Sequence, residues 1–207
     1  MKHGVVRLIL SLSLSFLDIY PAFSAQPPTN EEIVQRLSPK IEQLNRKELI
    51  ELAKAYSALG NSAEAVKTYT AILAIATKSP ETLTAIGTEQ IKMGKEIEAR
   101  QTLKTAVEIN KKYLPAYRQL IRLYEKRKNK YELRMIYADL VSILGNKPEY
   151  ITNLCDLTTA EGLFDQAMAY CKFGMELNST EPKNFVNMAI VLRETGKATE
   201  AESHLKS

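Results

Sequence analysis

The chain has 207 residues, of which 45% are hydrophobic, and this is enough for one substantial domain. Its formal net charge of +4 is too small to indicate, by itself, a nucleic-acid partner or a membrane surface. No alternation of period two is long enough to predict strands, so we expect helices to account for nearly all of the fold.

Residues 1–25 have the residue order of a secretory signal peptide. Lys2 and Arg7 precede an apolar run from Leu8 to Leu17. The break at 18–21 and the small residues Ala22, Ser24 and Ala25 follow. Because this run would span only about half of a bilayer core, a transmembrane helix is the weaker interpretation. A buried or amphipathic N-terminal helix is the other alternative. We expect cleavage after Ser24 and an exported protein, either periplasmic or secreted.

Residues 26–45 are predicted to form a polar linker followed by an N-terminal capping helix. Asn30, followed by two glutamates, indicates a helix start. Ile33, Val34 and Leu37 then give a short apolar stripe before Pro39 interrupts it. We expect residues 30–44 to cover the apolar end of the repeats that start at residue 46, because the terminal units of a repeat array must be capped.

From residue 46 onward the sequence repeats itself with a step of 34 residues. Gly60, Gly94, Gly162 and Gly196 each close an amphipathic run, and Lys128 stands where the fifth glycine of this series would be. Each unit is therefore predicted to contain two helices joined by a short turn. The units are predicted at 46–79, 80–113, 114–147, 148–181 and 182–207.

This pattern resembles the tetratricopeptide repeat (TPR) family, whose unit is a helix–turn–helix of the same length. The first unit has residues of the family's type at Leu52, Ala53 and Tyr69. The third unit departs most, since Ile121 and Leu133 occupy places that require small residues, and we expect it to be slightly splayed. The resemblance implies an all-α, right-handed superhelical solenoid of about five units.

The sequence offers little that could support catalysis. His3 lies in the predicted signal peptide, and His204 has no Cys or His partner at the spacing of a metal site. There is also no phosphate-binding glycine loop. We therefore predict a protein that is not an enzyme and that uses no cofactor and no metal ion.

The only two cysteines, Cys155 and Cys171, lie at equal distances from the turn of the fourth unit. On two antiparallel helices this placement brings their side chains to face each other. Export would supply an oxidising compartment, so we predict a disulfide. The alternative is a pair of small buried thiols that fill the helix interface.

A basic patch, defined as Lys126, Arg127, Lys128 and Lys130, lies at the turn of the third unit. Such a run is usually a solvated turn. The functional alternative is a basic edge that contacts an acidic partner, an anionic lipid head group or an envelope polymer. Nucleic acid is disfavoured by the export signal and by the lack of aromatic residues among these cations.

Five residues of the predicted first helices fall on the places that form a carboxylate clamp in chaperone-binding members of the resembled family. They are Arg118, Arg122, Asn153, Lys183 and Asn187. Three agree with the family in type, whereas Arg122 replaces an Asn and Asn187 replaces an Arg. Cations and amides in one groove suit a carboxylate ligand, and the alternative is that groove residues are simply exposed and therefore charged.

The resemblance thus implies a non-enzymatic scaffold of the cell envelope. It would bind a peptide or a partner helix in the concave groove, through an acidic or carboxylate-bearing segment of that partner. One alternative is an envelope-binding module that contacts anionic lipid or polymer peripherally through the basic patch. Another is an accessory domain of a longer enzyme or secretion component. The sequence predicts no particular oligomeric state.

Overall fold

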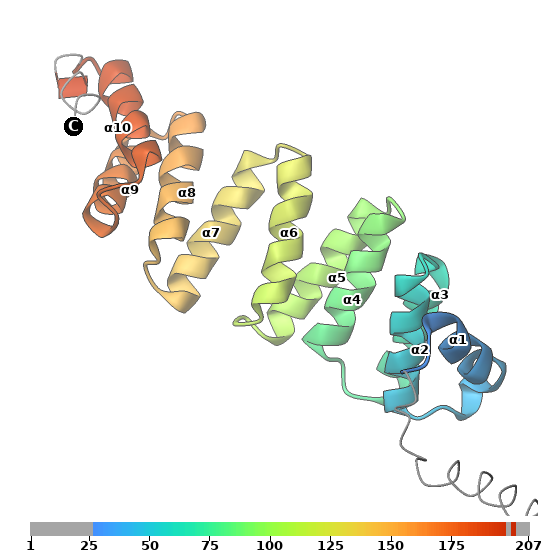
Figure 1. Ribbon diagram of the computed structural model, residues 1–207. Helices are drawn as coiled ribbons and strands as arrows, with labels where there is room; N and C mark the ends of the chain where they lie inside the picture. Colours follow the sequence, from blue (N-terminus) through green and yellow to red (C-terminus); the bar gives the residue numbers. More distant parts are fainter. Residues whose placement is uncertain (1–26, 198–199, 202–207) are drawn as a thin grey trace, which may run out of the picture.

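A computed structural model describes residues 27–197 and 200–201. Within these residues the chain forms ten α-helices and one 3₁₀ helix, without a strand (Figure 1). The predicted all-α solenoid is confirmed. The predicted signal peptide and His204 lie outside the described residues. The helices are α1 (Asn30–Leu37), η1 (Ser38–Gln43), α2 (Arg46–Ala58), α3 (Ser62–Ile75), α4 (Pro80–Lys92), α5 (Glu96–Ile109), α6 (Leu114–Lys126), α7 (Lys130–Leu144), α8 (Pro148–Ala160), α9 (Phe164–Leu177) and α10 (Pro182–Glu194).

The even-numbered helices from α2 to α10 are the first helices of successive units, and each begins one 34-residue step after the last. Pro80, Pro148 and Pro182 start three of them, at a helix position where the missing N–H costs no hydrogen bond. After each first helix, a residue in the left-handed region of φ turns the chain. Four of these residues are glycines with φ between 72° and 80°, and the fifth is Lys128 with φ of 53°.

The N-terminal segment packs on the first unit through α1 and η1. Thr29 rather than Asn30 caps α1, in a capping box with Glu32. Leu37 and Leu44 are buried and join the apolar core of the first unit. This segment therefore covers apolar surface that α2 would otherwise expose to solvent.

The apolar core runs along the array, between neighbouring units. Its largest cluster reaches from Leu103 on α5 to Leu154 and Leu157 on α8 and includes the buried Tyr117 and Tyr124 of α6. Further clusters join α2 to α4 and α8 to α10. Each unit is thus stabilised by packing on its neighbours as well as by packing between its own two helices.

The third unit is more open than the units beside it. The backbones of α6 and α7 approach each other over a shorter length than those of α4 and α5 or of α8 and α9 (Figure 1). Leu133 stands at the place where the other units have a buried alanine, and Ile121 stands at a place held by Ala53 in the first unit. These larger side chains keep the two helices apart, which is the splay that the sequence indicates.

Candidate functional site

The first helices form the inner side of the array. Helix α4 lies against α6, and α8 lies against α10, whereas none of the extensive helix contacts joins two second helices. In these two pairs the first helices are closer together than the second helices, so the side of the array that carries the first helices is the concave one. We call this surface the groove.

Three of the five predicted groove residues are exposed cations. Arg118 and Arg122 lie one turn apart on α6, and Lys183 lies in the first turn of α10. Within the described part of the chain none of the three forms an ion pair. Their charges are therefore available to a ligand.

The two predicted amides have partners within the protein. The side chain of Asn153 donates a hydrogen bond to the backbone oxygen of Glu149, 2.8 Å away on its own helix. Asn187 is only 6% exposed, and its Nδ2 donates to Oδ1 of Asp156 on α8 at 3.3 Å. Asn187 thus joins α10 to α8, so the structure assigns it a packing role in addition to its place in the groove.

Asn153 and Lys183 line a pocket of about 250 Å³ between α8 and α10. Glu149 and Glu181 line the same pocket, so its two carboxylates outnumber its single cation. Arg118 and Arg122 do not line it. The structure therefore divides the predicted set into a cationic part on α6 and a mixed polar part at α8 and α10.

Half of the basic patch is bound to the preceding unit. Lys126 Nζ lies 2.9 Å from Oε1 of Glu96, and Arg127 Nε lies 2.7 Å from the other carboxylate oxygen. Hydrogen bonds from Lys126 and Arg127 lower the pKa of the Glu96 carboxyl. Lys128 and Lys130 remain exposed and form no ion pair within the described residues. The charge that this turn offers to a polyanion is smaller than the sequence suggests.

Cys155 and Cys171 form a disulfide between α8 and α9. Their α-carbons are 4.8 Å apart, and both side chains are fully buried. A Cβ atom at Gly174 of α9 would lie 2.7 Å from Asn184 of α10, so this glycine allows α10 to pack closely on α9.

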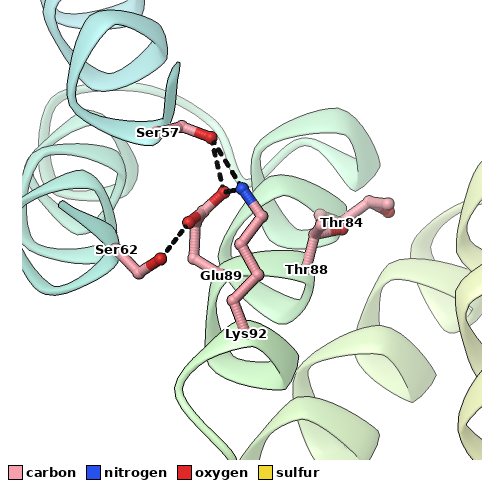
Figure 2. A network of polar contacts seen from close by, with 6 residues as sticks. All are labelled: Ser57, Ser62, Thr84, Thr88, Glu89 and Lys92. Carbon is pink, nitrogen blue, oxygen red and sulfur yellow. Dashed lines mark hydrogen bonds and ion pairs between the residues drawn. The ribbon is translucent and has the colours of Figure 1, made fainter. Parts of the chain in front are cut away.

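Sequence reasoning missed a polar cluster between the first two units, centred on Glu89 of α4 (Figure 2). Glu89 is 3% exposed and accepts hydrogen bonds from the hydroxyls of Ser57 and Ser62, each at 2.6 Å. Lys92 Nζ lies 2.7 Å from the same carboxylate. Burial alone would raise the pKa of Glu89, but the hydrogen bonds from Lys92, Ser57 and Ser62 outweigh it and lower the pKa.

A second pocket, of about 430 Å³, was also missed by sequence reasoning. It lies between α5, α6 and α7, at the opening of the third unit. Helix α7 contributes Tyr131, Met135 and Asp139, which are four residues apart and so share one helix face. We call it the α5–α7 pocket. Because two of its walls are second helices, it lies apart from the groove.

The described residues contain no group of three or more His, Cys, Asp or Glu side chains that could hold a metal ion. None of their helices is both long enough and apolar enough to cross a bilayer.

Residues 49–78 and 80–113 match the sequence model described as tetratricopeptide repeat. No curated protein sequence matches the chain. The structure of MamA from Desulfovibrio magneticus RS-1 is similar, with 12% identity, a TM-score of 0.56, and coverage of 78% of this chain and 91% of that chain. The structure of YrrB, described as a TPR protein with an unusual peptide-binding site, is also similar. Its sequence is 15% identical, the TM-score is 0.60, and the match covers 86% of this chain and 91% of that chain. At these identities the likeness concerns the fold.

Proposed function

We propose that the chain is a non-enzymatic scaffold that binds a segment of another protein in its groove, because two of its units match the tetratricopeptide repeat and the next two have the same helix–turn–helix form. The observation that carries this proposal is the pair of exposed arginines on α6. Arg118 and Arg122 lie one turn apart and form no ion pair with the rest of the described chain. The similarity to YrrB, whose structure is described as having a peptide-binding site, supports a peptide ligand for this fold.

The ligand segment should carry a carboxylate that contacts α6. Two guanidinium groups one helical turn apart can each form paired hydrogen bonds with a carboxylate, and such charge-assisted bonds are stronger than neutral ones. The neighbouring pocket contains Glu149 and Glu181, which repel a second carboxylate. We therefore expect the acidic part of the ligand at α6 and an uncharged or basic part at α8 and α10.

We place this scaffold in the cell envelope, as an exported protein. Two features support the location. The first is the order of charged, apolar and small residues in the first 25 positions. The second is the buried pair of Cys155 and Cys171, which lie at disulfide distance, because disulfides persist mainly in oxidising compartments.

The experiment is to capture partners from an envelope extract with the chain lacking residues 1–24, and then to measure the affinity of a purified partner. Replacing both Arg118 and Arg122 with Ala should weaken binding by about 10-fold to 100-fold, because each arginine contributes a charge-assisted hydrogen bond. The matched control replaces both Lys67 and Lys172 with Ala. These are exposed cations on the second helices α3 and α9. This control also removes two positive charges and should leave the affinity unchanged.

Equal affinities for the two double variants, both with unchanged melting temperature, would place the binding surface outside the α6 part of the groove. Salt provides a second readout. Binding through Arg118 and Arg122 should weaken as the ionic strength rises, whereas apolar packing should not. A salt-independent affinity would therefore also contradict the proposal.

A further inference from the structure

The α5–α7 pocket combines an apolar interior with an acidic edge. Apolar side chains lining it include Val107, Leu120 and Ile136. Tyr131 and Met135 stand at its solvent side, and they are 60% and 41% exposed. Exposed Tyr and Met side chains next to a cavity are typical of protein interfaces, and an isolated surface would not favour them.

The charged residues of the pocket give it a negative edge. Glu108, Glu132 and Asp139 contribute three carboxylates, against the single ammonium group of Lys104. Lys104 Nζ lies 3.4 Å from Glu132 and so neutralises that carboxylate. Glu108 and Asp139 are exposed and form no ion pair with any other described residue. A ligand for this pocket should therefore bring a positive charge beside its apolar part.

The aromatic wall of the pocket is held in place before any ligand binds. The guanidinium carbon of Arg134 lies 5.4 Å from the ring centre of Tyr131. Arg134 Nε in turn donates to Oε2 of Glu161 at 2.7 Å, and both of these side chains are largely buried. This chain of contacts favours one position of the Tyr131 ring, which reduces the entropy that a ligand would lose on binding.

We propose that the α5–α7 pocket is a second protein-binding site, which takes a partner segment with a large apolar side chain next to a lysine or arginine. The apolar side chain enters between Tyr131 and Met135, and the cation contacts Asp139 or Glu108. Tyr131, Met135 and Asp139 follow α7 for about 12 Å, at 1.5 Å per residue. A surface of this length suits a stretch of chain better than it suits a compact small molecule.

The pocket is tested with three fluorescein-labelled peptides of equal length and the full chain, by fluorescence anisotropy. One peptide has a central Phe flanked by lysines, the second has the same Phe flanked by glutamates, and the third has a central Ala flanked by lysines. The first should bind about tenfold more tightly than either of the others, because only it satisfies both the apolar interior and the acidic edge.

Two variants locate this binding on the protein. Replacing both Tyr131 and Met135 with Ala should weaken binding of the first peptide by about tenfold, while Ile97→Ala, which alters another exposed apolar residue outside the pocket, should not. Asp139→Lys should remove the preference for lysine-flanked over glutamate-flanked peptides, because the new positive charge offsets the negative charge of Glu108. Asp139 is exposed, so this variant is expected to fold.

Several outcomes would overturn the proposal. They are no binding of any peptide, equal binding of all three, or unchanged binding by the variant at Tyr131 and Met135. Binding of free p-cresol without binding of the peptides would identify a small-molecule site instead, which also contradicts it. The variant with both Arg118 and Arg122 replaced should bind the first peptide as tightly as wild type. A result that contradicts the pocket proposal therefore does not contradict the groove proposal, and the reverse is also true.

Discussion

Lys128 adopts a backbone conformation that glycine adopts at the turns of the other four units. Its φ of 53° lies in the left-handed region, where a side chain crowds the backbone at a cost of about 1 kcal/mol. Lys128→Gly should therefore raise the free energy of unfolding by about 0.5–1 kcal/mol, after allowance for the greater entropy of glycine in the unfolded chain. Urea denaturation followed by circular dichroism measures this change.

Lys128→Ala is the control for this prediction. It removes the same positive charge from the basic patch but keeps a Cβ atom, so it should give much less stabilisation. An increase of equal size in both variants would mean that the gain came from reduced charge repulsion among the patch residues, and that backbone strain at this turn was negligible.

Glu89 stands where the other first helices have apolar residues, namely Ala55, Leu123, Leu157 and Val191. A carboxylate at this buried place is stable only because Ser57, Ser62 and Lys92 contact it. Glu89→Gln keeps the shape but removes the charge, and it should lower the free energy of unfolding at pH 7 by about 1–3 kcal/mol.

The decrease in the free energy of unfolding caused by Glu89→Gln should depend on pH, in a direction set by the pKa of Glu89. That pKa is lowered by folding, so the ionised carboxylate stabilises the protein above pH 4.5, the ordinary value for the group. The stabilisation disappears as the pH falls through the lower folded value. The difference between wild type and Glu89→Gln should therefore shrink on acidification, as chemical denaturation at several pH values would show. A constant difference would mean that Glu89 acts through packing alone.

At the scale of the helix pair, Leu133 stands where the other units have an alanine between their two closely packed helices. The equivalent residues Ala65, Ala99, Ala167 and Ala201 are buried. Leu133 is buried as well and belongs to the largest apolar cluster. Although Leu133→Ala would restore the common residue, it should cost about 2–5 kcal/mol, because α6 and α7 are too far apart to close the cavity that remains.

The reverse exchange, Ala99→Leu in the second unit, is the matched comparison. There α4 and α5 are in close contact, and even a Cβ atom at Gly87 would lie 2.7 Å from Leu103. The added bulk should destabilise the protein by about 1–3 kcal/mol. Thermal unfolding of both variants measures the effects. A stabilising Leu133→Ala would contradict the predicted cost, since it would mean that α6 and α7 close together once this side chain is removed.

The helices could be predicted from the sequence because glycine, proline and the 34-residue step all report the same local geometry. Lys128 illustrates this, since its place in the series predicts a turn that its residue type does not. The α5–α7 pocket could not be predicted in the same way, because it depends on the distance between helices. Glu89 could have been found, since a carboxylate in a column of apolar residues at the 34-residue spacing requires a partner.

The contacts of the candidate groove residues could be predicted only in part, for a physical reason. Position on a first helix predicts that a side chain is near the concave surface, and Arg118 and Arg122 are exposed residues of α6. It does not indicate which neighbouring side chain that residue contacts. Asn187 and Asp156 are far apart in sequence and are joined by a hydrogen bond, which only the packing of α10 on α8 reveals.

At the scale of the whole molecule, the two candidate surfaces have opposite charge. Arg118 and Arg122 on α6 are cationic, whereas Glu108 and Asp139 give the α5–α7 pocket a negative edge. Both surfaces involve the third unit. If both proposed sites bind their ligands, the scaffold would hold an acidic segment and a basic segment at the same time and would select each by charge.

The final prediction concerns the mature chain in its compartment. If residues 1–24 are a signal peptide, the protein recovered from the envelope fraction should begin at Ala25 or Gln26. In that oxidising compartment Cys155 and Cys171 should be joined, because their α-carbons are only 4.8 Å apart and they are the only cysteines of the chain. The bond should stabilise the fourth unit by about 3 kcal/mol, on a loop-entropy estimate.

Intact mass under non-reducing conditions gives the N-terminus, and thiol labelling of the unfolded, unreduced protein gives the state of the cysteines. We expect no labelled thiol before reduction and two after it, together with a lower melting temperature of the reduced protein. A retained Met1 with a cytosolic location would contradict export, and two free thiols in the exported protein would contradict the disulfide alone. The two results are separable because the N-terminus and the number of free thiols are measured independently.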